Sequence, residues 1–127
     1  MSRQAILSTK YILDLLNDNA DLTSIVGDRI FPLDATQSTA FPFIVIQRDN
    51  IVINYLTKDQ YVNDEAVVSI YVVSQSYLQA VNIAQLVRLS LERKHNDVIE
   101  DIKFTGAQES YYNNSFVQVL NFNIEYK

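Results

Sequence analysis

The chain has 127 residues, a net charge of −5 and no cysteine. Its length fits one domain with a single core, and 48% hydrophobic against 20% charged residues excludes a disordered chain. Without cysteine there is no disulfide framework, thiolate nucleophile or cysteine-based metal site. The ten basic residues are scattered, and the acidic balance argues against nucleic-acid binding as the main activity. We therefore treat residues 1–127 as one domain.

The beginning of the chain lacks the unbroken apolar run of a signal peptide. No apolar stretch approaches the length that spans a bilayer. The sequence therefore predicts a protein of a cytoplasm, with no membrane partner.

Two helices are predicted at the start of the chain. The first covers residues 2–17, with Ser2 as its N-cap. Asp21 is expected to cap a short second helix over residues 22–26, which Gly27 ends as a left-handed C-cap. The apolar residues expected on the broad inner side of the first helix are Ile6, Leu7, Ile12, Leu13, Leu15 and Leu16.

A short strand and a longer one follow. Residues 29–31 form a brief predicted strand that Pro32 ends, and residues 33–40 form a polar loop. Pro42 stands at the entrance of a β-branched run over residues 43–47, where a proline is tolerated.

Residues 54–64 are polar but include Tyr55, Leu56 and Tyr61, and they contain no tight-turn signature. They are predicted to form either a protruding hairpin or a mobile arm. Residues 65–74 carry the strongest strand pattern of the chain, apolar on both faces at its centre.

Ser76 is expected to cap a long helix that reaches Leu91, and Arg93, Lys94 and His95 are expected to close it, because positive charge suits a helix C-terminus. Apolar residues recur on one side of this helix at helical spacing. They are Ala80, Ile83, Ala84, Val87 and Leu91.

Two last strands are predicted over residues 102–112 and 116–126, joined by a turn at residues 113–114. Alternation in the final strand predicts one buried and one wet face. The predicted fold class is therefore α+β. It has an antiparallel or mixed sheet of about four to five strands, with the long helix and the N-terminal helix packed on one face.

The sequence contains few residues in patterns that indicate catalysis, metal binding or phosphate binding. The sole histidine, His95, is interpreted as a helix-end residue and not as a base or metal ligand. Asp97, Glu100 and Asp101 lack calcium-loop spacing and are interpreted as a solvated acidic turn. With two glycines in the whole chain, no phosphate-binding loop is present. We expect no catalytic residue, no cofactor and no metal.

The eight tyrosines are the unusual feature of the composition. Tyrosine is enriched at interfaces because it combines a large apolar ring with a polar tip. For Tyr55 and Tyr61 an interface role and a core-capping role both stay open, whereas Tyr71 and Tyr126 are expected in the core.

Two blocks of sequence resemble the tail-terminator, or tail-completion, proteins of long-tailed bacteriophages and prophages. The first block consists of Val26, Gly27, Asp28, Arg29, Ile30, Phe31 and Pro32. The second consists of Phe41, Pro42, Phe43, Ile44, Val45 and Ile46. The resemblance extends through the strand over residues 67–73 and the long helix, and it covers nearly the whole chain.

This resemblance implies a structural virion protein and not an enzyme. It implies a homo-oligomer, a six-membered ring, that caps the head-proximal end of the tail tube, ends tube polymerisation and joins the tail to the head-completion protein. DNA would pass through the ring without being specifically bound. The protein would be found in the host cytoplasm during assembly and in the virion tail afterwards.

Exposed apolar residues within polar segments are typical of subunit contacts. We therefore expect Leu33, Tyr55, Leu56 and Tyr61 at a subunit interface, an inference from the residues and not from the family's motif.

The alternatives to a tail terminator are another phage neck or tail-assembly protein, or a small cytoplasmic binding module that uses the sheet face as an apolar pocket.

Overall fold

The computed structural model describes residues 4–35, 39–57 and 60–127, and for residues 55–57 and 60–62 it describes the backbone alone. Its elements follow the predicted order of helices and strands. They are the 3-10 helix η1 (Ala5–Leu7), α1 (Ser8–Asn17), α2 (Ala20–Val26), β1 (Ile30–Pro32), β2 (Phe43–Thr57), β3 (Gln60–Ser74), α3 (Tyr77–Leu91), β4 (Ile99–Tyr112) and β5 (Ser115–Tyr126).

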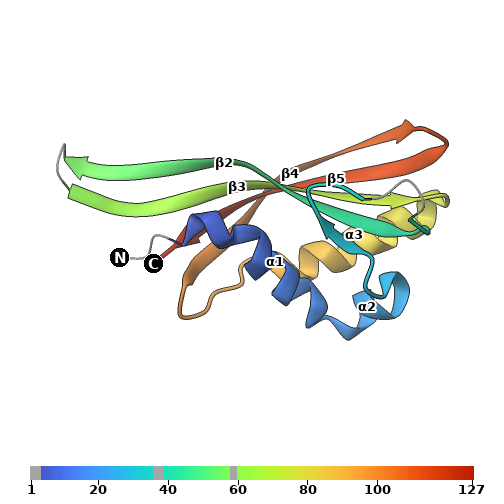
Figure 1. Cartoon of the computed structure of the whole chain (residues 1–127), viewed down its shortest axis with the longest axis horizontal. Helices are drawn as coiled ribbons and strands as arrows, with labels where there is room; N and C mark the ends of the chain where they lie inside the picture. Colours follow the sequence, from blue (N-terminus) through green and yellow to red (C-terminus); the bar gives the residue numbers. More distant parts are fainter. Residues whose placement is uncertain (1–3, 36–38, 58–59) are drawn as a thin grey trace.

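The strands form one five-stranded sheet in the order β1-β2-β3-β5-β4. The pairs between the four long strands are antiparallel, and β1 is parallel to β2, so the sheet is mixed. The three α-helices of the described chain all lie on one side of the sheet (Figure 1). The predicted α+β class, the number of strands and the one-sided helix layer are therefore confirmed.

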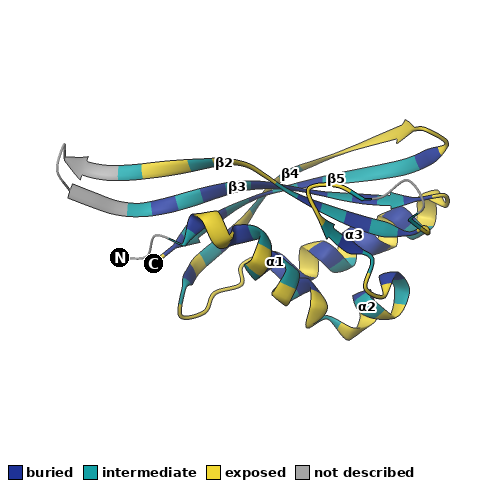
Figure 2. Ribbon diagram, viewed as in Figure 1, coloured by how far each residue is buried: buried dark blue, intermediate teal, exposed yellow. Residues whose placement is uncertain are grey.

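The core lies between the helices and the inner face of the sheet (Figure 2). Side chains alternate across a strand, so every second residue of the central strand β3 faces the helices. Val68, Ile70 and Val72 are fully buried there. On β5 the predicted alternation holds, since Leu120, Phe122, Ile124 and Tyr126 are all buried.

The N-terminal helix differs in part from its prediction. The predicted cap Ser2 lies outside the described residues, and α1 begins only at Ser8, after the 3-10 turn of η1. That change of winding turns Ile6 and Leu7 to solvent, so their predicted place on the inner side was wrong. Ile12 and Leu16 are buried as expected.

The cap of α2 is Asn19 and not the predicted Asp21. The Asn19 Oδ1 accepts hydrogen bonds from the amides of Asp21 and Leu22, at 3.1 and 3.2 Å. Gly27 ends α2 with the predicted positive φ of 61°. Its ψ of −129° lies outside the left-handed helical region, in a part of backbone space that favours glycine more strongly still.

Strands β2 and β3 extend much further into the polar segment than predicted, because their backbones continue to pair as far as Thr57 and Gln60. The last pair between β3 and β5 joins Glu65 to Glu125. Residues 53–57 and 60–64 therefore form a two-stranded hairpin, here called the arm, that projects beyond the end of β5 (Figure 1). Residues 54–64 were predicted to form either a protruding hairpin or a mobile arm, and the described backbone forms a protruding hairpin.

Helix α3 has the predicted cap and the predicted last residue, but the three basic residues do not belong to it. Ser76 caps the helix by accepting from the Gln79 amide, and all five predicted core positions are buried. The helix ends at Leu91, so the three basic residues predicted to close it lie beyond it. Arg93 takes a φ of 64° and donates its amide to the Ile102 carbonyl, which turns the chain toward β4.

A hydrogen bond ties the first helix to the last strand. The Tyr126 hydroxyl and the Ser8 Oγ lie 2.5 Å apart, and Ser8 Oγ also donates to the Ala5 carbonyl. Tyr126 is 1% exposed, as expected for a core tyrosine, and burial raises its pKa to about 12.

Replacing the observed cap should cost more than replacing the predicted one. Asn19→Ala removes the acceptor of two helix amides and the 2.7 Å bond from Asn19 Nδ2 to Ser90 Oγ. We expect the free energy of unfolding in urea to fall by about 1–2 kcal/mol. The matched control, Asp21→Ala, should lose at most about 0.5 kcal/mol. Equal losses in the two variants would contradict the assignment of the cap.

Tyr126 should make stability depend on pH in alkaline solution. Its folded pKa of about 12 lies above the ordinary value, so its contribution is complete below about pH 10 and is lost as the pH rises through 12. Between pH 9 and 12 the wild-type chain should lose about 2 kcal/mol more than Tyr126→Phe. Parallel losses in denaturant titrations of both proteins would show that Tyr126 is not the titrating group.

Candidate interaction face

The face of the sheet turned away from the helices is the candidate functional surface. We call it the open face (Figure 1). The prediction of a wet outer face holds for only half of it, because Asn121, Asn123 and Glu125 of β5 give way to Val117 and Val119 toward the β4–β5 turn. The open face therefore has a polar half and an apolar half, which are described in turn.

A row of hydrogen-bonded polar side chains crosses the middle of the open face. The Ser69 hydroxyl lies against the Asp49 carboxylate and 3.0 Å from Asn121 Oδ1. Asn121 Nδ2 donates to Gln108 Oε1 at 2.9 Å, and Gln47 Nε2 donates to Asp49 at 2.9 Å. The row therefore links β2, β3, β5 and β4. The row lies level with a bulge in β2, between Arg48 and Asn50, and with a bulge in β4, between Phe104 and Gly106.

The part of the open face next to the arm is acidic. Glu65 and Glu125 face each other across β3 and β5, and Asp101 is the β4 partner of Glu125. Two cations lie among them. Lys103 Nζ is 2.8 Å from Glu125 Oε1, a contact that raises the pKa of Lys103, and Arg93 Nη1 is 2.5 Å from Asp101 Oδ2. Together with Asp49, these residues give the polar half more carboxylates than cations.

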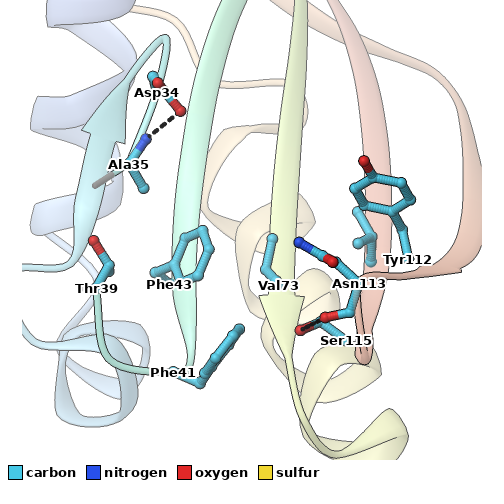
Figure 3. Close-up of a pocket in the computed structure, with 10 residues that line it drawn as sticks. Asp34, Ala35, Thr39, Phe41, Phe43, Val73, Tyr112, Asn113 and Ser115 are labelled. Carbon is cyan, nitrogen blue, oxygen red and sulfur yellow. Dashed lines mark hydrogen bonds between the residues drawn. The ribbon is translucent and has the colours of Figure 1, made fainter. Parts of the chain in front are cut away.

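The apolar half of the open face is hollowed into what we call the trough (Figure 3). It consists of two adjoining hollows of about 530 and 400 Å³ that share Val73, Tyr112 and Val117. The other apolar residues of its lining are Leu33, Ala35, Phe41, Phe43, Val45, Tyr71 and Val119. The polar residues of the lining are Asp34, Thr39, Gln47, Ser110, Asn113 and Ser115, and Asp34 is the one charged residue among the lining residues.

The turn between β4 and β5 forms one wall of the trough. Asn113 and Asn114 both have positive φ, 58° and 63°, which confirms the predicted turn. Tyr112 lies on the trough side and is 74% exposed. Tyr111 lies on the other side, where its ring contacts Phe116 at 4.9 Å between centroids.

The β4–β5 turn is held by a stack that reaches α3. The Phe116 ring lies between Tyr111 and Tyr77, with 5.7 Å between the Phe116 and Tyr77 centroids. Glu109 accepts from Gln118 Nε2 at 2.8 Å and from the Tyr77 hydroxyl at 2.9 Å. These two hydrogen bonds lower the pKa of Glu109, and its carboxylate raises the pKa of Tyr77. Contacts within the chain itself therefore hold this wall of the trough in place.

The structure places one predicted interface residue at the trough. Leu33 is 71% exposed, has a φ of 70° and lines the trough beside Val45. The side chains of Tyr55, Leu56 and Tyr61 lie outside the described residues, although their backbones belong to the arm. Tyr71 is half-buried on the open face, so its predicted place in the core was wrong. Side chains alternate along β3, and Tyr71 is on the side turned away from the helices.

The two sequence blocks of the family resemblance meet in space. Arg29 Nε donates to the Pro42 carbonyl at 2.9 Å, and Arg29 Nη2 donates to the Ile25 carbonyl at 3.2 Å. Ile30 is buried opposite Ile44 in the parallel β1–β2 pair. Arg29 thus fixes the end of α2 to the entrance of β2, a structural role for the motif.

The residues after α3 show no catalytic arrangement. His95 is exposed, and Asp101 is half-buried in a 2.5 Å ion pair with Arg93, so Asp101 is not the solvated residue that was predicted. Within the described ranges, no three His, Asp or Glu side chains are grouped so that they could hold a metal ion.

The stack behind the trough wall should be needed for the order of the turn. Phe116→Ala removes two ring contacts, so we expect stability to fall by about 1–2 kcal/mol. Amide exchange at Tyr111 and Tyr112 should accelerate by roughly tenfold. Tyr112→Ala is the control and should change stability by less than about 0.5 kcal/mol, because that ring is mostly exposed. Unchanged exchange in Phe116→Ala would contradict this role.

None of the helices in the described part of the chain is long and apolar enough to cross a membrane.

Comparisons with known proteins identify the family. The family model described as tail completion protein gp17 matches residues 10–125. No curated protein matched the chain. A chain of the structure titled "Virion of native gene transfer agent (GTA) particle" shares the fold, with a TM-score of 0.81 at 13% identity over 98% of each chain. The protein belongs to the tail completion protein gp17 family and is a structural protein of a phage tail.

Proposed function

We propose that six copies of the chain form a ring that caps the head-proximal end of the tail tube. The ring ends polymerisation of the tube and then joins the tail to the head-completion protein. The single observation that carries the proposal is the family match over residues 10–125, nearly the whole chain.

The sheet supports self-assembly because both of its long edges are open. On one side β1 pairs only with residues 44–46 of β2, and among the described residues no strand pairs with the rest of that edge. On the other side β4 is the outermost strand. The two edges belong to different strands, so contacts between copies that use them would be heterologous, the type that closes into rings.

The charge of the open face supports passage of DNA without binding. Asp49, Glu65 and Glu125 lie on it, and the cation Lys103 is paired with Glu125. A channel wall of this composition repels the phosphate backbone and offers it no row of cations. The net charge of −5 acts in the same direction.

A second candidate function is a small binding module, and the trough favours it. Hollows of 400–530 Å³ are within the size range of small-ligand sites. The lining, however, has a single charged residue, Asp34, and it is a wide surface and not an enclosed cavity. Another role in the phage neck or tail is the remaining alternative.

Purified tail tubes test the proposed function. Wild-type protein added to growing tubes should halt their elongation and appear as a ring at one end of each tube in electron micrographs. Tyr55→Ala/Tyr61→Ala should fold, with an unchanged circular dichroism spectrum, but should form rings less well. Tyr55→Phe/Tyr61→Phe keeps the apolar area and is the matched control.

Tubes that keep growing at saturating protein concentration would contradict the capping role. Rings of unchanged stability in the double alanine variant would remove the two tyrosines from the interface while leaving the capping role in place.

A further inference from the structure

Beyond its base, where Asp64 is buried, the arm pairs with no other strand of the described residues. Its two strands pair with each other from Ile53↔Asp64 to Thr57↔Gln60, beyond the last pair that β3 makes with β5. A two-stranded hairpin without a packed face is at best marginally stable in water. Ile53 is 49% exposed at the base of the arm, and the sequence beyond it includes Tyr55 and Leu56. The arm is therefore expected to gain stability from a surface that packs against it.

The trough is an apolar concave surface that no described helix covers, so it could receive a segment such as the arm (Figures 1 and 3). Its floor is made of half-buried valines and aromatic rings, among them Phe43, Val45, Val73 and Val117. Leu33 and Tyr112, both more than two-thirds exposed, rise on opposite sides of it. Apolar surface of this kind on a soluble chain marks a contact with another protein.

The arm and the trough cannot meet within one copy. They lie at opposite ends of the sheet (Figure 1). Along β2, ten residues separate Phe43 in the trough from Ile53 at the base of the arm. At ~3.3 Å per residue this distance is about 33 Å. Any contact between the two surfaces must therefore join two molecules.

We propose that the arm of one copy docks in the trough of the next. This inference rests on the proposed ring, and it names the contact that would join neighbouring copies in that ring. Because the two surfaces differ, the contact is head-to-tail, and repetition closes into a ring when the rotation between copies is a whole fraction of a turn. The trough is bordered by the β4–β5 turn on one side and by residues 33–35 on the other.

The chemistry of the two surfaces matches. The segment from Asn54 to Asn63 contains Tyr55, Leu56, Tyr61 and Val62, and its two charges, Lys58 and Asp59, are adjacent and opposite. Asp34 is the one charged residue of the trough lining, and the floor of valines and aromatic rings favours an apolar occupant over a charged one. The outer side of α3 also exposes apolar residues, among them Leu78 at 72%, and Leu78 lines neither hollow of the trough. It therefore supplies a matched control.

Cross-linking tests the contact directly, because the natural chain has no cysteine. Leu33→Cys places a single thiol at the trough, Tyr55→Cys places one on the arm, and Leu78→Cys is the control. A short bis-maleimide should join the arm and trough variants when they are mixed, and should leave each variant alone mostly monomeric. The double variant Leu33→Cys/Tyr55→Cys should give a ladder of covalent oligomers that ends at the ring. The reactions are run with the free chain over a concentration range and with the chain bound to tail tubes.

A second pair of variants tests the direction of assembly. Leu33→Glu and Tyr61→Glu should each reduce the wild-type oligomer to the 14.6 kDa monomer in light scattering. Their mixture keeps one intact trough and one intact arm, so it should give a heterodimer and nothing larger. Leu78→Glu should assemble as the wild type does, and circular dichroism verifies that each variant is folded.

The proposal is overturned if arm–trough cross-links are no more abundant than those of Leu78→Cys, both in solution and on tubes. It is equally overturned if both glutamate variants assemble normally, or if their mixture stays monomeric. Tubes that are capped without arm–trough cross-links would refute this contact and leave the proposed function standing. A cross-linked ring that does not cap tubes would refute the proposed function and leave the contact standing.

Discussion

The burial of one face of the central strand β3 is the constraint on which the rest of the structure depends. β3 pairs with β2 on one side and with β5 on the other, so its backbone hydrogen bonds are made within the sheet. Its inward residues Val68, Ile70 and Val72 then require a cover of the same extent. Helices α1 and α3 supply that cover, and because both lie on one side, the other face is left for partners.

The two faces of the sheet thus have different purposes. The inner face is uniformly apolar and holds the fold together, and the Ser8–Tyr126 bond closes it at the end where the chain starts and finishes. The open face changes along its length from carboxylates to a hydrogen-bonded polar row and then to the trough. This gradient agrees with the proposed ring subunit, in which one part of the face would repel DNA and another would bind protein.

The two sequence blocks serve the fold first, although Phe41, Phe43 and Val45 of the second block also line the trough. Arg29 and Pro42, from the blocks that resemble tail-completion proteins, bond to each other and set the position of β2 relative to α2. Neither lies among the charged residues of the open face. The sequence identified a family more readily than an interface, because which residues of the second block stay uncovered depends on the side of the sheet against which the helices pack.

Local rules determined the elements and the family of this protein. Helical spacing located α3 and its cap Ser76, strand alternation located the buried side of β5, and Asn113-Asn114 located the last turn, because each of these depends on neighbours in sequence. The tertiary structure decided what depends on distant partners. Pairing between β2 and β3 carried a polar segment into a long hairpin, and the neighbouring strands placed Tyr71 on the open face. The trough likewise exists only because Leu33, Val73 and Tyr112, far apart in sequence, are brought together by strand order.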